Sequence, residues 1–453
     1  MFMNMKKITV LLATVIVLAC LPTTIIGQEN LVNPVPSTHI TIGDRLACTS
    51  FTRLDLRFSD LTDEDIVSLR YMTNLRVLWL EVNQISDITP LAYLTNLTEL
   101  HLGDNPISDL TPLAGLTNLT ELRLIGNPVS DLTPLAGLVN LETLWLVNTL
   151  ASDVTPLAGL ENLVHLTLEG SPVSDLTPLA GLTNLEVLRL RRSPVSDLAP
   201  LSGLTNLELL GIWHSEISDL TPLESLENLE RLFLTDNKIS DIGSLAKLIN
   251  LQSLVLDDNQ ISDITPLTGL TNLSFLILNN NQISDLTPLA DLVDLGILEL
   301  NGNQINDLTP LTGLINLNIG FLANNQISDL TPLADLVNLG ILELRNNQIS
   351  NITPLAGLVN LESLRLKNNQ ISDITPLNGL LNLDVLVLGN NQINDITPLS
   401  NLENLGHLVL DSNQISDLTP LADLVNLRWI SIYNNPITDR TPIDHIPAVV
   451  GRP

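Results

Sequence analysis

The fold is decided by a stretch of 22 residues, 74–95, that reads NLRVLWLEVNQISDITPLAYLT. The pattern occurs 17 times at a period of 22 residues, with no insertion or deletion, and the last copy starts at residue 426. A fixed period of this length is typical of a solenoid, in which one repeat is too small to bury its apolar face and stacking completes the core. We therefore expect one repeating domain, although 453 residues would otherwise suggest about three domains.

Each repeat predicts one coil, with a strand on one side and a tight turn on the other. Leu78, Trp79 and Leu80 alternate between inward and outward positions, which is typical of a short strand. Further along, Thr89 is suited to cap a helix and Pro90 to its first position, but the remaining length allows only a 3₁₀ turn. Stacked coils then align the strands in one parallel sheet.

A polar residue follows each strand at the predicted bend. Thirteen of the 17 repeats carry Asn there, as at Asn83, and its amide can satisfy backbone groups that have no partner in the sheet. The other four carry hydroxyl residues, which can bond fewer groups: Thr149, Ser171, Ser193 and Ser215.

This pattern resembles the leucine-rich repeats, specifically the 22-residue class of bacterial internalin-type proteins, over residues 50 to about 445. The resemblance implies an α/β solenoid: a horseshoe with a parallel sheet on the concave side and 3₁₀ or irregular turns on the convex side. It also implies that the concave face binds proteins, and that the chain acts at the cell surface as internalin relatives do.

The first residues have the pattern of a secretory signal peptide. Lys6 and Lys7 precede an apolar run, 8–19, that would span roughly 18 Å as a helix, too short for the roughly 30 Å core of a membrane. We expect either cleavage near residue 27 or lipidation of Cys20, because residues 17–20 resemble a lipoprotein box. Both outcomes predict a secreted or cell-envelope protein without a transmembrane span. The expected segments are 1–27 as signal peptide (1–19 if Cys20 is lipidated), 28–49 as N-terminal flank or cap, 50–73 as a divergent first repeat, 74–445 as seventeen repeats and 446–453 as C-terminal tail.

The repeats differ from one another mainly at the outward positions three, five, seven and eight, counted from the first Leu of a repeat. In a chain of net charge −30, basic and aromatic side chains gather at these positions in the first half. Arg forms bidentate bonds with carboxylates, and aromatic residues are enriched at binding hot spots. The predicted partner-binding residues are Trp79, His101, Arg123, Trp145, His165, Arg189, Arg191, Arg192, Trp213, His214, Arg231 and Phe233.

Two alternatives would leave less of this surface available to a partner. The aromatic side chains could stack on one another along the sheet and simply cover it. The arginines could pair with acidic neighbours such as Glu169, Glu186 and Glu208.

The second half has more uniform repeats, which we interpret as scaffold or a secondary surface. Its outward positions are rich in Asn, and its candidate contact residues are Phe275, Phe321, Trp429 and Tyr433. Gly320 stands where other repeats carry Leu or Ile in the core, so we expect a local weak point there.

An acidic column runs from Asp87 to Asp439, broken only by Asn351. Calcium is one interpretation, but it needs six to eight oxygen ligands and each coil offers a single Asp. The other interpretation is local: each Asp accepts turn N–H groups in front of the Thr-Pro pair.

The sequence contains no recognisable catalytic motif, phosphate loop or metal-ligand spacing, and its six histidines are scattered. We therefore expect no enzyme activity, no cofactor and no metal site. The acidic balance disfavours nucleic acid. A protein ligand is the expected partner. The alternatives are a glycan, bound by a carbohydrate-binding adhesin, and a target protein whose activity the secreted chain modulates.

Overall fold

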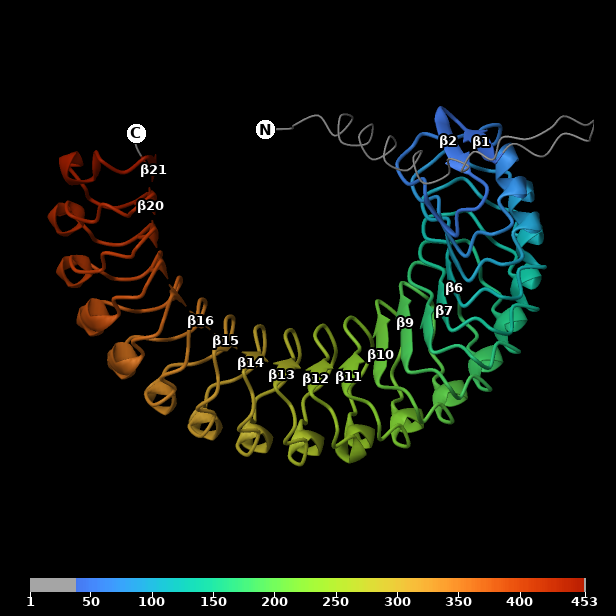
Figure 1. Ribbon diagram of the computed structural model, residues 1–453. Helices are drawn as coiled ribbons and strands as arrows, with labels where there is room; N and C mark the ends of the chain where they lie inside the picture. Colours follow the sequence, from blue (N-terminus) through green and yellow to red (C-terminus); the bar gives the residue numbers. More distant parts are fainter. Residues whose placement is uncertain (1–37, 452–453) are drawn as a thin grey trace, which may run out of the picture. The chain divides into compact units, whose positions relative to one another are not determined.

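The computed structural model describes residues 38–451 and divides them into two compact units, one ending at Val195 and the other beginning at Ser196. We call them the N-terminal unit and the C-terminal unit. In each unit, every coil places its strand on the inner side and its 3₁₀ turn on the outer side (Figure 1). The repeating α/β solenoid predicted from the sequence is confirmed.

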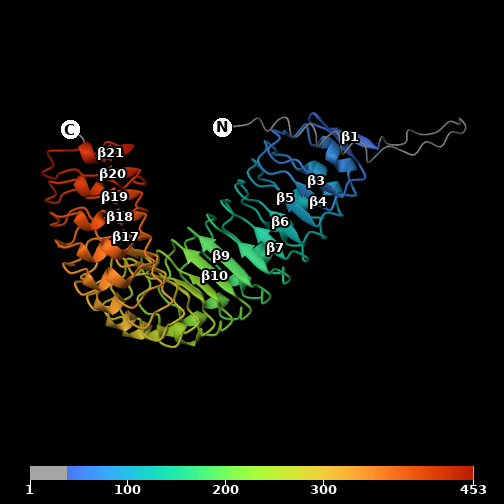
Figure 2. The same ribbon diagram turned by 60° about the vertical axis from the view of Figure 1, so that its left-hand side comes forward.

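The N-terminal unit begins with an antiparallel hairpin of β1 (His39–Ile42) and β2 (Arg45–Cys48), which the sequence did not predict. The parallel strands follow it, and Figure 2 shows several of them side by side. These strands are β3 (Arg53–Asp55), β4 (Val77–Trp79), β5 (Glu99–His101), β6 (Glu121–Arg123), β7 (Thr143–Trp145), β8 (His165–Thr167) and β9 (Val187–Arg191). The 3₁₀ turns are η2 (Val67–Tyr71), η3 (Thr89–Tyr93), η4 (Thr111–Leu113), η5 (Thr133–Leu135), η6 (Thr155–Leu157) and η7 (Thr177–Leu179).

The C-terminal unit continues the same alternation of strands and 3₁₀ turns. Its strands are β10 (Leu209–Trp213), β11 (Arg231–Phe233), β12 (Ser253–Val255), β13 (Phe275–Ile277), β14 (Ile297–Glu299), β15 (Ile319–Phe321), β16 (Ile341–Glu343), β17 (Ser363–Arg365), β18 (Val385–Val387), β19 (His407–Val409), β20 (Trp429–Ser431) and β21 (Ala448–Val450). Its turns are η8 (Ala199–Leu201), η9 (Thr221–Leu223), η10 (Gly243–Lys247), η11 (Thr265–Leu267), η12 (Thr287–Leu289), η13 (Thr309–Leu311), η14 (Thr331–Leu333), η15 (Thr353–Gly357), η16 (Thr375–Gly379), η17 (Thr397–Leu399), η18 (Thr419–Leu421) and η19 (Thr441–Ile443).

The register of the sheet follows the repeat. Leu54 pairs with Leu78 across the divergent first repeat, and Leu78 pairs with Leu100 one repeat later. Equivalent positions therefore stand side by side on neighbouring strands, in columns. The inward Leu and Ile columns are almost completely buried and form the core.

The bend asparagines do what their position predicts. In Asn259 the amide nitrogen donates to the carbonyl oxygens of Leu234, Leu256 and Asp257 at 2.9–3.1 Å, and its oxygen accepts the N–H of Ile239 at 3.0 Å. One buried side chain thus satisfies four backbone groups and links successive coils.

The repeats with hydroxyl bends use different bonds. Thr149 shares a 2.8 Å hydrogen bond with the hydroxyl of Ser171, which itself lies 2.8 Å from the carbonyl oxygen of Leu146. The N–H of Val173 bonds at 2.8 Å to the carbonyl oxygen of Ser171, a local three-residue turn. In repeats followed by an asparagine bend, the equivalent N–H donates to the asparagine side chain of the next repeat. Here a backbone carbonyl oxygen accepts it instead.

The side chains of the acidic column accept hydrogen bonds from the turns that follow them. In Asp263 the carboxylate accepts the N–H of Thr265 at 2.8 Å, and Asn351 replaces it by accepting the N–H of Thr353 at 3.0 Å. The prediction that Thr caps the 3₁₀ turn is wrong, because Thr265 is the first residue of the turn and the Asp two positions earlier binds its N–H. Within residues 38–451, no helix is long and apolar enough to cross a membrane. The predicted signal segment and Cys20 lie outside the described residues.

Candidate binding surface

The outward positions of the strands form the candidate surface, and the two units each carry part of the predicted residue set. In the N-terminal unit the set divides into two groups with opposite character. One group, around Trp79 and His101, is held in a dense internal network. The other, around Arg189, has few internal partners.

The first group centres on His101, in the middle of the sheet. Its imidazole is only 6% exposed and stacks against the ring of Trp79, with centroids 5.6 Å apart and 12° between the planes. Nδ1 lies 3.2 Å from a carboxylate oxygen of Glu81, and Nε2 lies 3.2 Å from Glu99 and 3.1 Å from Glu121. His101 is therefore buried behind its neighbours rather than presented to a partner.

Two arginines of the divergent repeat cover the same tryptophan. The guanidinium carbon of Arg53 lies 4.1 Å from the ring centroid of Trp79, and that of Arg57 lies 4.5 Å away. Arg57 also binds Asp55 at 2.8 Å, and this bond lowers the pKa of the Asp55 carboxyl. The ring of Trp79 is thus half-buried beneath cationic groups that the sequence did not single out.

Arg123 and Trp145 extend this network to the next strands. The guanidinium of Arg123 binds Glu121 at 2.7 Å and lies over the ring of Trp145, 4.9 Å from its centroid. Aromatic coverage of the sheet and local ion pairing therefore both occur in this group. The acidic partner is Glu121, and among the described residues Glu169, Glu186 and Glu208 form no ion pair.

The second group behaves differently. Arg191 and Arg192 are exposed, and neither makes an ion pair within residues 38–451. The Nε of Arg189 is buried and has no hydrogen-bond partner among those same residues. His165 lies exposed on the neighbouring strand β8. Arg191 and Arg192 are therefore available to an external acceptor, whereas the buried Nε of Arg189 is a desolvated N–H group that carries a free-energy cost.

The eighth position of the repeats lies in the bend after the strand and is not an ordinary outward strand position. Its residues adopt positive φ, a left-handed conformation that Gly, Asn and Asp tolerate and that costs other residues roughly 1–2 kcal/mol. Most repeats conform, and Gly126, Gly170 and Gly302 in this column were a readable signal. The exceptions are Val82 at φ 58°, Arg192 at 56°, His214 at 52° and Ser412 at 53°.

In the C-terminal unit, Trp213 and Phe233 form one aromatic pair. Their rings stack with centroids 6.0 Å apart. The indole of Trp213 folds back over Gly211, where an added Cβ would lie 2.3 Å from a ring atom, so only glycine leaves room for this ring. His214 binds Asp236 at 2.7 Å, and Arg231 is exposed.

The predicted secondary surface is mixed. Phe275, Phe321 and Trp429 are half-buried, whereas Tyr433 is 67% exposed. The asparagines interpreted as scaffold form a ladder along the left-handed column, in which Asn346 donates to Asn324 at 2.5 Å. The ladder continues with hydrogen bonds from Asn368 to Asn346 and from Asn390 to Asn368.

One buried carboxylate lies on the strands of the C-terminal unit. Glu343 is 3% exposed, and its oxygens lie 3.5 Å from Arg345 and 3.8 Å from Arg365. Burial raises the pKa of Glu343, and the bond from the backbone N–H of Arg345 and the two positive charges act against that rise.

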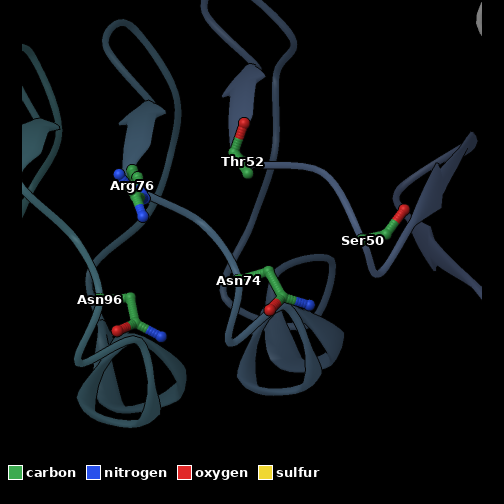
Figure 3. Close-up of a pocket in the computed structure, with 5 residues that line it drawn as sticks. All are labelled: Ser50, Thr52, Asn74, Arg76 and Asn96. Atoms are coloured by element: carbon green, nitrogen blue, oxygen red, sulfur yellow. The ribbon is translucent and has the colours of Figure 1, made fainter.

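A shallow open groove lies at the start of the first strands, lined by Ser50, Thr52, Asn74, Arg76 and Asn96. Figure 3 shows Asn74 and Asn96 at equivalent places on successive coils. The amide of Asn96 is already bound to the carbonyl oxygen of Thr73 at 2.8 Å, and Asn74 binds that of Thr49 at 3.2 Å. These groups belong to the scaffold, because the same bond recurs in most repeats.

Comparison with known proteins identifies the repeat. A family model described as leucine-rich repeats in two copies matches residues 95–137, 227–269, 271–316, 338–379, 359–404 and 381–423. No match is found among curated proteins.

The solved structures that are similar to this chain include three leucine-rich-repeat proteins. Internalin InlF of Listeria monocytogenes is 33% identical, with 73% of this chain and 91% of InlF covered and a TM-score of 0.57. A leucine-rich-repeat protein of Leptospira interrogans is 25% identical, with 87% of this chain and all of that chain (100%) covered and a TM-score of 0.74. The plant peptide hormone receptor RGFR1, solved in complex with RGF2, is 23% identical, with 80% and 64% covered and a TM-score of 0.68, and it shows the fold alone.

Proposed function

Because the chain belongs to the leucine-rich-repeat proteins of the bacterial internalin class, we propose that it is a recognition protein that binds another protein on the strand face of its N-terminal unit. The repeat fold is a non-catalytic protein-interaction scaffold in this family. Solenoids of this type present an extended inner surface to their partners.

The observation that carries the proposal is the group of Arg189, Arg191 and Arg192. Within the described residues none of them has an ion pair, although the chain has 50 acidic and 20 basic residues. Three neighbouring cations without an ion pair, one of them (Arg192) in a left-handed conformation, support a contact surface at this place.

The chemistry of this group predicts the partner. Guanidinium groups bind carboxylates in bidentate geometry, and an acidic patch on a protein offers several at once. Exposed His165 adds another donor on the next strand, and Trp145 adds aromatic contact area. We infer a protein ligand with an acidic contact surface.

We place this activity outside the cytoplasm. The support is the sequence of the first residues, where two lysines precede an apolar run too short to span a membrane. Mass spectrometry of the mature N-terminus tests it: cleavage near residue 27 or a lipidated Cys20 is expected, and an intact Met1 in exported or envelope fractions would contradict it.

The binding proposal is tested with a display library of extracellular protein domains. Any domain that binds the wild-type chain is then titrated against R189A/R191A/R192A, which should weaken binding by about 100-fold or more. The matched control is K238A/K247A/K367A, which removes the same charge from exposed positions of the C-terminal unit and should leave affinity unchanged.

A glycan array provides the opposing test. Binding to glycans alone, dependent on Trp213 and Phe233, would replace the protein partner with a carbohydrate. Protein binding that is equally strong in both triple variants would move the contact surface away from the arginines.

A further inference from the structure

The cluster around His101 has the geometry of a metal site, which the sequence did not predict. One nitrogen of His101 and one carboxylate oxygen each from Glu99 and Glu121 lie within 4.8 Å of one another. They come from adjacent strands, β5 and β6, because Glu99 pairs directly with Glu121 in the sheet. The imidazole is held in place by stacking against Trp79.

The distances around Nε2 match the spacing between ligands of one metal ion. Nε2 lies 3.1 Å from Glu121 and 3.2 Å from Glu99, whereas a charge-assisted N–H···O bond is about 2.7–2.9 Å long. One N–H group can reach both oxygens only in a three-centre hydrogen bond. Two ligands of a tetrahedral zinc ion, each about 2.05 Å from the metal, stand about 3.3 Å apart.

The second nitrogen of His101 has the partner that a metal-bound histidine needs. Nδ1 faces a carboxylate oxygen of Glu81 at 3.2 Å, the contact by which a carboxylate orients a metal-bound imidazole. The remaining oxygen of Glu81 is buried and has no hydrogen-bond partner among the described residues. The arrangement is a carboxylate–histidine pair aimed at one point.

The two glutamates are also positioned by donors. Trp79 Nε1 donates to Glu99 at 2.7 Å, and Arg123 donates to Glu121 at 2.7 Å. The Glu99 oxygen keeps a second lone pair for an ion. The Glu121 oxygen that faces His101 lies 2.7 Å from two nitrogens of Arg123, so an ion would have to displace one of these N–H groups. Three carboxylates surround the imidazole and Arg123 is the guanidinium that pairs with one of them, so the cluster favours a cation.

We propose that Glu99, His101 and Glu121 bind a divalent transition-metal ion of the zinc type, with Glu81 as the orienting carboxylate. An imidazole ligand excludes calcium and magnesium, which take oxygen ligands, and favours zinc. The glutamate side chains are 26% and 27% exposed, so an ion can enter and water can complete the coordination. The site is independent of the acidic column on the opposite part of the coil.

The experiment uses the full chain without a polyhistidine tag, stripped with a chelator and titrated with Zn²⁺ by calorimetry. We expect one ion per chain, with a rise in thermal midpoint as zinc is added. Replacing the zinc by Co²⁺ should give the visible absorption of a tetrahedral site with mixed nitrogen and oxygen ligands. H101Q should abolish binding, and E121Q should weaken it by at least about 10-fold.

Two comparisons keep the test decisive. H165Q, which alters an exposed histidine outside the cluster, should bind zinc as the wild type does, and E81Q should weaken binding by about 10–100-fold while keeping the stoichiometry. Circular dichroism of each variant verifies folding. No zinc binding by a folded wild-type chain, or equal binding by folded H101Q or E121Q, would show that the cluster is an imidazole clamped by carboxylates and nothing more.

Discussion

The N-terminal and C-terminal units share one 22-residue frame but differ in how often they depart from its pattern of polar residues. The C-terminal unit repeats the same solution: asparagines close every bend from Asn237 to Asn435, and an asparagine ladder occupies much of the left-handed column. The N-terminal unit departs from this pattern more often, with three of the four hydroxyl bends and with Val82 and Arg192 in left-handed conformations. The departures of the C-terminal unit are Ser215, His214 and Ser412.

The difference separates residues that maintain the fold from residues that do something else. The core columns are alike in both units, so the fold does not require the departures. They coincide with the cations and aromatic residues of the N-terminal strand face. Substitutions that place the residue type of one unit at the equivalent position of the other can therefore test whether the departures lower the free energy of unfolding.

The largest effect is expected at the bends. N259A removes four hydrogen bonds and leaves buried backbone groups unsatisfied, so we expect a loss of about 3 kcal/mol or more in unfolding free energy. T149A removes one bond, to Ser171, and should cost about 1 kcal/mol. Urea unfolding measures both, and equal losses would mean that the two kinds of bend contribute alike.

The left-handed column gives the next effect, with opposite signs in the two units. V82N relieves a β-branched residue at φ 58° and should stabilise the chain by about 1 kcal/mol. N346V introduces the same strain and breaks the amide ladder, so it should destabilise by about 1–2 kcal/mol. A stabilising N346V, or a destabilising V82N, would show that this column is not set by backbone conformation.

Gly320 is the exception within the regular C-terminal core. An added Cβ would make ordinary contacts, 3.5 Å from Leu342 and 3.7 Å from Leu339. G320A should therefore stabilise by about 0.5–1 kcal/mol, since glycine has the larger conformational freedom to lose. Hydrogen exchange over residues 316–325 should slow in the variant, and faster exchange would indicate that the neighbours cannot accept even one methyl group.

The fold was predictable because one period governs most of the chain, and residue columns follow directly from a constant register. The site was less predictable. The repeat pattern predicts that the side chain of His101 points outward from the sheet. It does not predict that Trp79 stacks on His101 or that glutamates of neighbouring strands lie near its ring nitrogens. The left-handed column could have been recognised from Gly126, Gly170 and Gly302, whereas the hairpin β1–β2 has no repeat to reveal it.

The smallest effect concerns the acidic column, which both units share. Hydrogen bonds from the hydroxyl and N–H of Thr265 lower the pKa of Asp263 below its ordinary 3.8. A depressed folded pKa gives stability that is present above about pH 4 and is lost as pH falls through the lowered value, because the unfolded chain then binds the proton first. Both units should therefore lose stability in acid, below about pH 4.

Asn351 shows how to isolate this contribution, because it makes the same bond without a titratable group. D263N should keep the thermal midpoint within about 2 °C of the wild type at pH 7 and fall less steeply between pH 4 and pH 3. The reverse change, N351D, should add acid sensitivity. Thermal melts across this pH range measure both, and an acid transition that D263N and N351D leave unchanged would place the acid sensitivity in other carboxylates.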